Sequence, residues 1–208
     1  MSVEIWVAFV VASGVVLAIP GPTILTVISY SVAHGRRANV PLVIAVALGD
    51  STAMVASVFG LGAIFATSAF WFTVVKWAGG AYLLYLGVRM LRASASAAEI
   101  ASPMVPGSRW RVFATTYLVT ALNPKSIVFF VAFLPQFINH DAPLTQQLWV
   151  LTITFVVMAT VNATLYASFA VSARELLASP RAQRRFNVVG GSLLSVAGVW
   201  GLLARRTP

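Results

Sequence analysis

A Pro-Gly-Pro triplet at positions 20–22 interrupts an uncharged stretch that runs from Ile5 to Ala33 and is long enough to cross a membrane. Proline inside a helix removes a backbone donor and clashes with the preceding turn, and glycine has a low helix preference. The stretch is therefore predicted to form a broken helix. At membrane depth the backbone groups that a break frees need protein or water partners, so the break should line a cavity or a protein interface.

A second interruption, Asn123-Pro124-Lys125, lies deep inside another apolar stretch far downstream. Paired interruptions in corresponding parts of two halves are the best sequence indication of a transport site. Free N–H groups at half-helix N-termini attract anions, and free carbonyls at C-termini attract cations. We therefore predict that Pro20, Gly21, Pro22, Asn123, Pro124 and Lys125 face one another near the membrane midplane and bind a substrate that carries both charges. The alternative is that the prolines only bend the helices for packing.

The composition indicates a membrane protein. Of the 208 residues, 59% are hydrophobic and 9% are charged, whereas soluble domains carry about 25% charged residues. The chain has no cysteine and two histidines, which excludes disulfides, thiol catalysis and cysteine metal sites. We expect no metal and no cofactor. An intramembrane enzyme would need clustered catalytic or ligating side chains, so the pattern argues against an enzyme.

Hydropathy predicts an all-α polytopic protein of six transmembrane helices that forms a single transporter domain over residues 1–208. Residues 38–88 contain only two charges and are long enough for two spans, with a turn near residues 67–69. The first stretch carries an acidic residue where a signal peptide would be basic, so we interpret it as a permanent helix. The spans lie at about 5–28, 39–66, 70–90, 112–135, 146–171 and 187–204.

A polar connection at residues 93–108 separates two halves, 1–92 and 109–208. Each half would contain three spans, and three is an odd number. If the halves are structural repeats, they must therefore have opposite orientations in the membrane. The support for a repeat is the matched position of the breaks, each in the first span of its half.

The arginines predict the orientation. The loops after spans 1, 3 and 5 share one side and carry ten arginines, against two at the C-terminus on the other side. The positive-inside rule places those loops in the cytoplasm and both termini outside. The ten arginines are Arg36, Arg37, Arg89, Arg92, Arg109, Arg111, Arg174, Arg181, Arg184 and Arg185. The pair at the C-terminus, Arg205 and Arg206, disagrees with this orientation.

Asp50 is the only acidic residue inside a span. It lies about eleven residues into its span, roughly 16 Å from the end, where a carboxylate costs at least about 2.5 kcal/mol. It is predicted either to couple protons or bind an ammonium group, or to form a structural ion pair. Lys125 lies at a similar depth, so it could neutralise Asp50 or attract a substrate carboxylate. Lys76 is close enough to a span end to reach the interface.

Three polar residues of the fifth span, Thr154, Asn162 and Tyr166, can share one helix face. They could line a substrate pathway, where we place Asn162, or they could form interhelical hydrogen bonds. Small residues recur every four positions in the second span and are predicted to allow close helix packing. Glycines of the third and sixth spans are predicted to do the same. The small residues of the second span are Ala45, Gly49, Ala53 and Ser57.

These motifs together resemble the LysE/RhtB superfamily of amino-acid exporters. The resemblance rests on the two breaks, on Gly49-Asp50, on Gly35-Arg36-Arg37-Ala38 and on Lys76 with the sequence GGAYLLYLG at 79–87. It covers nearly the whole chain, although after Lys125 only the hydropathy matches. It implies a small bacterial inner-membrane protein that exports amino acids or their derivatives in exchange for protons, and it is compatible with homo-oligomers.

The sequence alone thus favours a secondary exporter with small-molecule, proton and lipid partners and no nucleic-acid partner. It has no G-x-x-x-x-G-K-[ST] phosphate-binding pattern, which argues against ATP-driven transport by this chain. A channel or a structural membrane subunit is the alternative. A channel needs a continuous filter or a charged ring, and one copy of this sequence displays neither.

Overall fold

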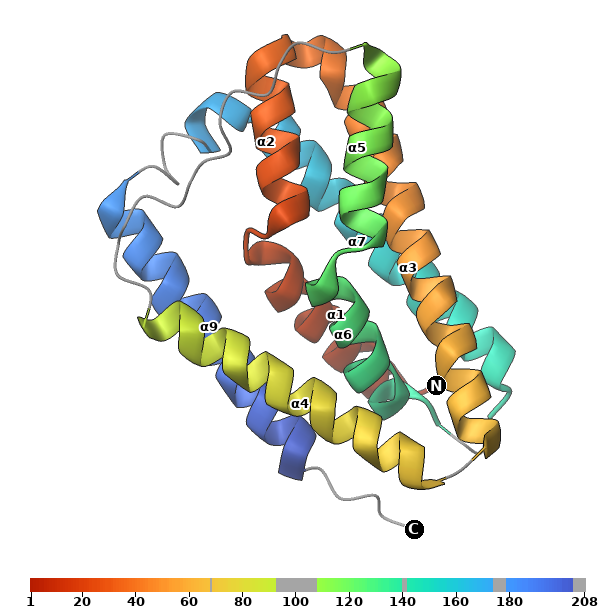
Figure 1. Ribbon diagram of the computed structural model, residues 1–208. Helices are drawn as coiled ribbons and strands as arrows, with labels where there is room; N and C mark the ends of the chain where they lie inside the picture. Colours follow the sequence, from red (N-terminus) through yellow and green to blue (C-terminus); the bar gives the residue numbers. More distant parts are fainter. Residues whose placement is uncertain (68, 93–107, 140–141, 174–178, 204–208) are drawn as a thin grey trace.

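The structure is a computed structural model that describes residues 1–67, 69–92, 108–139, 142–173 and 179–203. All regular secondary structure in those residues is helical (Figure 1). The helices are α1 (Val3–Ala18), α2 (Pro22–His34), η1 (Gly35–Ala38), α3 (Asn39–Thr67), α4 (Ala69–Arg92), α5 (Arg109–Ala121), α6 (Pro124–Phe133), η2 (Leu134–Phe137), α7 (Leu144–Ser168) and α9 (Pro180–Leu203).

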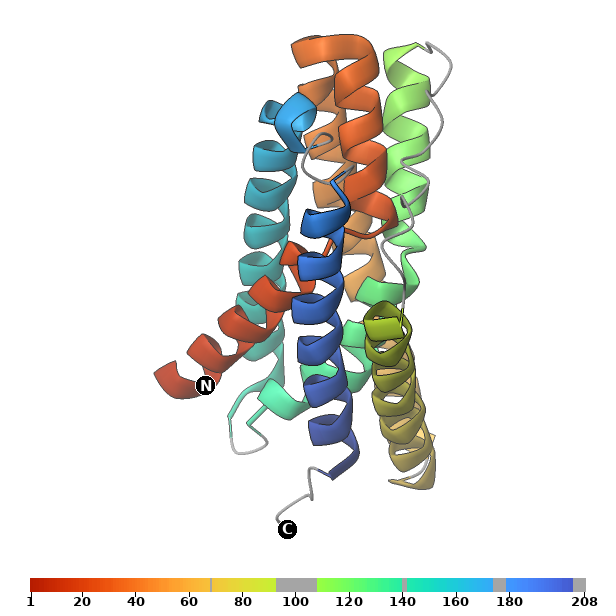
Figure 2. The same ribbon diagram turned by 90° about the vertical axis from the view of Figure 1, so that its left-hand side faces the viewer.

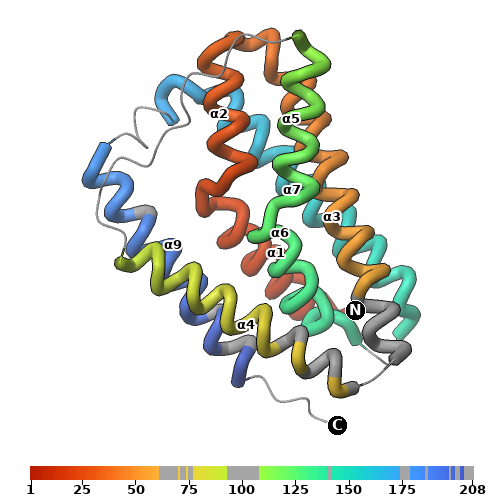
Figure 3. The backbone as a smooth tube through the Cα atoms, in the orientation of Figure 1, coloured from red at the N-terminus to blue at the C-terminus, as the bar shows by residue number. Residues whose placement is uncertain are grey.

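Both predicted breaks are confirmed. Helix α1 ends at Ala18 and α2 begins at Pro22, with Gly21 in an extended conformation as its N-cap. Proline is tolerated at the first position of a helix because its missing N–H has no intrahelical acceptor there. The second break follows the same rule: α5 ends at Ala121, and α6 begins at Pro124 after an extended Asn123. The tube in Figure 3 shows both interruptions in the middle of the fold.

The long helices α3 and α7 pack against each other and run in opposite directions (Figure 1). Helix α5 lies along α3, and α2 lies against both α5 and α7. Helices α4 and α9 form an antiparallel pair that extends away from the α2–α5 end of the bundle (Figure 2). The shorter helices α1 and α6 each have one end in the centre of the fold: α1 ends at the first break, and α6 begins at the second.

Glycines allow the closest helix contacts, as predicted. A Cβ at Gly49 of α3 would lie 2.7 Å from the Thr120 Cβ of α5. In the α4–α9 pair, a Cβ at Gly198 would lie 2.6 Å from the backbone nitrogen of Leu84. Heavy atoms cannot approach so closely, so the missing side chains set the separation of these helices.

The helices extend further than the hydropathy pattern predicted, and several residues assigned to loops are helical. Helix α9 begins at Pro180, so Arg181 and its neighbours lie in its first turns. His34 is the last residue of α2. Arginine and histidine are compatible with helices, and a hydropathy threshold detects the apolar part of a helix and misses polar turns. The other basic residues placed in loops are also helical, in η1, α4, α5 and α9: Arg36, Arg37, Arg89, Arg92, Arg109, Arg111, Arg184 and Arg185.

Three stretches of the described chain are long and apolar enough to cross a membrane: Pro22–Gly60, Arg109–Phe137 and Leu144–Ser168. Val3–Ala18 is a shorter apolar helix. The predicted six-span arrangement therefore stays a prediction. Several features of the sequence lie outside the described residues: Ser68, residues 93–107, His140, Arg174, and the C-terminal Arg205 and Arg206. The side chains of Lys76 and Gly201 are likewise not described.

Candidate transport site

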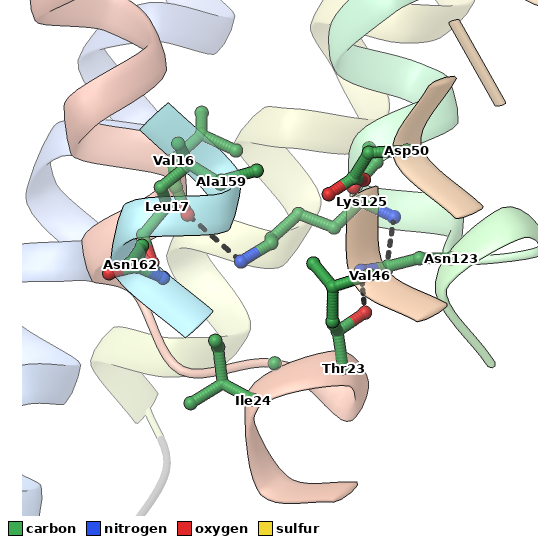
Figure 4. A pocket seen from close by; sticks show the side chains of 12 residues that line it. Val16, Leu17, Thr23, Ile24, Val46, Asp50, Asn123, Lys125, Ala159 and Asn162 are labelled. Carbon is green, nitrogen blue, oxygen red and sulfur yellow. Dashed lines mark hydrogen bonds between the residues drawn. The ribbon is translucent and has the colours of Figure 1, made fainter. Parts of the chain in front are cut away.

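The two breaks meet at a small polar cavity of about 20 Å³. Residues beside both breaks line it, together with Asp50 from α3 and Asn162 from α7 (Figure 4). A cavity needs roughly 10–15 Å³ to hold one water molecule, so this one has no room for an amino acid in the present conformation. The remaining lining residues are Val16, Leu17, Gly21, Thr23, Ile24, Val46, Asn123, Lys125, Ser126 and Ala159.

Asn123 joins the two breaks directly. Its side-chain oxygen accepts a hydrogen bond of 3.1 Å from the backbone N–H of Lys125, which caps the N-terminus of α6. Its amide nitrogen donates a hydrogen bond of 3.1 Å to the Thr23 hydroxyl in the first turn of α2. Asn123 and Thr23 are both buried. One side chain thus stabilises the second break and links it to the first.

Side chains from other helices satisfy the carbonyls at the end of α1. A helix leaves its last four carbonyls without intrahelical partners. The Lys125 ammonium donates to the carbonyls of Val16, at 2.9 Å, and Ile19, at 2.7 Å. The two carbonyls between them, those of Leu17 and Ala18, accept from α7. The α1 terminus is therefore fully hydrogen-bonded although it ends inside the protein.

The α7 side chains that complete this cap are Asn162 and Tyr166. The Asn162 amide donates to the Leu17 carbonyl at 3.2 Å, and the Tyr166 hydroxyl donates to the Ala18 carbonyl at 3.4 Å. Near the other end of α1, the Trp6 indole donates to the Thr154 hydroxyl at 3.1 Å. All three polar residues of this α7 face therefore bond to α1. The interhelical reading is confirmed, and Asn162 also borders the cavity.

Lys125 brings a positive charge to the negative end of the α1 dipole, a favourable placement. Its side chain extends from α6 across the cavity, and its ammonium lies beside Val16 and Leu17 (Figure 4). The Asp50 carboxylate is 3% exposed and interacts electrostatically with Lys125 and with Ser126. Asp50 and Lys125 thus interact as opposite charges, as predicted. The hydrogen bonds of the Lys125 ammonium, however, are made to carbonyls at the end of α1.

The start of α2 has no such cap. Its N-cap residue is Gly21, which has no side chain to accept a hydrogen bond from the first turn. Gly21, Thr23 and Ile24 border the cavity, and the first turn of any helix carries N–H groups without intrahelical acceptors. The cavity therefore lies between the C-terminus of α1, the negative end of its dipole, and the N-terminus of α2, the positive end. Lys125 already occupies the C-terminus of α1.

Sequence reasoning placed several of these residues correctly and missed others. Of the predicted positions, Gly21, Asp50, Asn123, Lys125 and Asn162 border the cavity. The prolines do not border it, and they act by setting where the helices end and begin. Thr23 and Ser126 were missed, although each is a polar residue within two positions of a helix-initiating proline. The carbonyls of residues 16–19 were also missed individually, because a backbone carbonyl has no sequence signature.

Hydrophobic clusters lie along both broken helices. On the α6 side, Phe9, Phe129 and Phe155 belong to the main core, and their rings pack in stacked and tilted contacts. On the α2 side, a separate buried cluster contains Tyr30, Ala38, Leu42 and Val112. The α2-side cluster is much the smaller of the two. The cavity thus lies within an apolar helical bundle.

Two broken helices that meet at one cavity lined by Asp50 and Lys125, within a bundle whose helices include stretches apolar enough to cross a bilayer, define a membrane transporter. The comparison with known families agrees. The chain belongs to the LysE type translocator family, whose match covers residues 14–204.

Relatives in this family match the whole chain. The homoserine/homoserine lactone efflux protein of Salmonella typhimurium is 33% identical over 206 residues, which are 99% of this chain and 100% of the relative. A membrane protein of Vibrio cholerae is 31% identical over 96% of this chain and 97% of its own length. The membrane protein YrhP of Bacillus subtilis is 26% identical over 92% of this chain and 95% of its own length. No solved structure matches the chain.

Proposed function

We propose that the protein is a secondary exporter of amino acids or small amino-acid derivatives, driven by protons. The observation that carries the proposal is the meeting of the two helix breaks at one buried cavity that also contains Asp50 and Lys125. The efflux function named for the Salmonella relative supports the same substrate class. Homoserine and its lactone are therefore the first substrates to test.

The charges around the cavity suit a zwitterion. The α2 N-terminus favours a carboxylate, and the α1 C-terminus and Asp50 favour an ammonium group. Lys125 adds a second group that can bind a carboxylate. Asp50 is also the carboxylate best placed to exchange a proton, because it is buried beside the site. Among the described residues, Lys125 is the one charged group that acts on it.

The small volume of the cavity supports transport by alternating access. A substrate larger than water can be accommodated only after the surrounding helices separate. The small cluster around Tyr30, Leu42 and Val112 is the thinner barrier, and it lies toward η1. The arginines of η1, Arg36 and Arg37, are among those that predict a cytoplasmic end. Entry from the cytoplasm through this cluster and release on the opposite side would constitute export.

We further propose that six spans in the bacterial inner membrane form two inverted halves. Helices α1 to α4 would correspond to α5, α6, α7 and α9. In support, α3 packs against α7 and α4 packs against α9, and each pair is antiparallel. Similarly, α2 contacts α7, and its counterpart α6 contacts α3. Contacts of this kind are expected around a twofold axis between inverted repeats.

The experiment is flux measurement with purified protein in liposomes. Vesicles loaded with labelled homoserine are given an imposed proton gradient, and saturable efflux that collapses with a protonophore is the expected result. Protein-free vesicles and vesicles that contain an unrelated membrane protein are the controls. Flux that does not saturate would favour a channel, and the absence of flux for any amino acid or derivative would favour a structural subunit.

A further inference from the structure

Lys125 makes contacts that a free amino compound would also make. Its ammonium donates to the Val16 and Ile19 carbonyls, at 2.9 Å and 2.7 Å, at the C-terminal end of α1. A primary ammonium group has three donors, so one remains after these two bonds. The same ammonium faces Gly21, where an added Cβ would lie only 3.3 Å from the Lys125 Nζ.

We infer that the α1 C-terminal carbonyls are the ammonium subsite of the transporter, and that Lys125 occupies this subsite when no substrate is bound. The inference rests on the proposed function. On binding, the substrate ammonium takes the Val16 and Ile19 carbonyls and displaces Lys125. The released lysine then lies beside the cavity, where a substrate carboxylate or Asp50 can receive it.

The neighbouring contacts favour this exchange over a purely structural role for Lys125. The Leu17 and Ala18 carbonyls accept hydrogen bonds from neutral donors of α7. These two hydrogen bonds do not involve Lys125, so they remain when it leaves. The cavity touches Val16, Gly21 and Lys125 together, which puts the exchanged groups at its wall. Asp50 interacts with Lys125 electrostatically in the present position, and it lines the cavity into which the lysine would be released.

The exchange defines a ligand class. A ligand must carry a free primary ammonium group, whereas a carboxylate is not required for binding. Homoserine has both groups. Its lactone keeps the ammonium group but has an ester in place of the carboxylate. N-acetylhomoserine keeps the carboxylate and lacks the ammonium group. The site should therefore accept the first two compounds and reject the third.

The test is binding calorimetry on purified protein in detergent with these three compounds. The informative variant is Lys125→Met, which keeps an unbranched side chain of nearly the same length and removes its charge. It eliminates the internal competitor, which should tighten lactone binding roughly tenfold. Homoserine gains in the same way but loses the lysine as a carboxylate partner, so the ratio of lactone affinity to homoserine affinity should rise. Tyr166→Phe is the matched control: it removes one neutral donor from the same helix end and should leave this ratio unchanged.

An unchanged or lower ratio in Lys125→Met would overturn the inference. Binding of N-acetylhomoserine to the wild type as tightly as homoserine would overturn it as well, and this measurement does not depend on any variant folding. These results are distinct from failure of the proposed function. If the wild type exports homoserine but the ratio does not change, only the ammonium subsite is wrong. If it exports no amino acid or derivative, the exporter proposal itself fails.

Discussion

At the scale of single residues, the site depends on two opposite charges that cannot be moved independently. Asp50 and Lys125 come from different helices, and each reduces the cost of burying the other. Removing one partner of a buried pair leaves the other uncompensated, which is costly. Their roles must therefore be tested with substitutions that keep the side chain close to its native size.

We predict that Asp50→Asn inserts and folds but loses proton-driven export. Asparagine keeps the shape and polarity of the side chain and removes the group that can exchange a proton. Facilitated exchange of substrate without a gradient should be less affected than gradient-driven efflux. The measurement is efflux from liposomes as a function of internal and external pH, with protein insertion checked by size-exclusion chromatography. The same pH dependence in Asp50→Asn and wild type would remove Asp50 from the coupling role.

We predict that Asn123→Ala destabilises the protein more than the loss of a helix cap alone. Asn123 caps α6 and also bonds to Thr23 of the other break. A lost cap costs about 1 kcal/mol, and a buried hydrogen bond contributes about 1 kcal/mol more. Thermal unfolding in detergent measures the difference. Ser108→Ala is the control, because Ser108 caps α5 at an exposed position. Equal shifts in unfolding temperature would show that the link between the breaks adds nothing.

At the scale of helices, the two breaks and the glycines of α4 and α9 have different structural effects. The breaks expose helix ends in the interior, and side chains of neighbouring helices then complete their hydrogen bonding. The glycines of α4 and α9 bring two complete helices into backbone contact. In the α4–α9 pair, a Cβ on Gly191 would lie 2.7 Å from the carbonyl oxygen of Gly87.

We predict that Gly198→Val separates α4 from α9 and destabilises the protein by about 1–3 kcal/mol, the typical cost of overpacking. The added side chain would meet the backbone of α4, which cannot turn aside. Gly60→Val is the matched control, because a Cβ at Gly60 meets nothing within 4 Å. Unfolding temperatures in detergent report the effect. A Gly198→Val protein as stable as Gly60→Val would contradict the close packing of this pair.

At the scale of the whole molecule, the orientation in the membrane decides which end of the helical bundle faces the cytoplasm. The arginine distribution predicts that η1 is cytoplasmic and that the start of α1 is outside. The chain has no native cysteine, so single introduced cysteines report position without background. Val3 and Arg37 are both exposed and lie at opposite ends of the α1–α2 unit.

We predict that Val3→Cys reacts with a membrane-impermeant thiol reagent in spheroplasts, whereas Arg37→Cys reacts only after the membrane is permeabilised. Arg37→Lys in the Val3→Cys background controls for an effect of the arginine on topology. Labelling is read by gel shift. Protection of Val3→Cys together with reaction of Arg37→Cys in intact spheroplasts would reverse the predicted orientation and place η1 outside.

The sequence predicted the parts of this protein that depend on local chemistry. A proline deep in an apolar stretch removes a backbone donor and clashes with the preceding turn, so the breaks at Gly21 and Asn123 could be located without a structure. An ionisable residue in an apolar span needs a partner, which singled out Asp50 and Lys125. Helix ends were less well predicted, because polar first turns such as Pro180–Arg185 of α9 look like loops in a hydropathy profile.

Tertiary structure decided which groups meet. The sequence by itself determined that two helices would break and that a lysine and an aspartate would lie at a similar depth. Only the fold placed the Lys125 ammonium on the Val16 and Ile19 carbonyls and brought Asn162 and Tyr166 to the carbonyls between them. The physical reason is that every residue has the same backbone carbonyl. A carbonyl becomes a cation site only where a helix ends inside the protein, and its partner there is set by the packing of helices distant in the sequence.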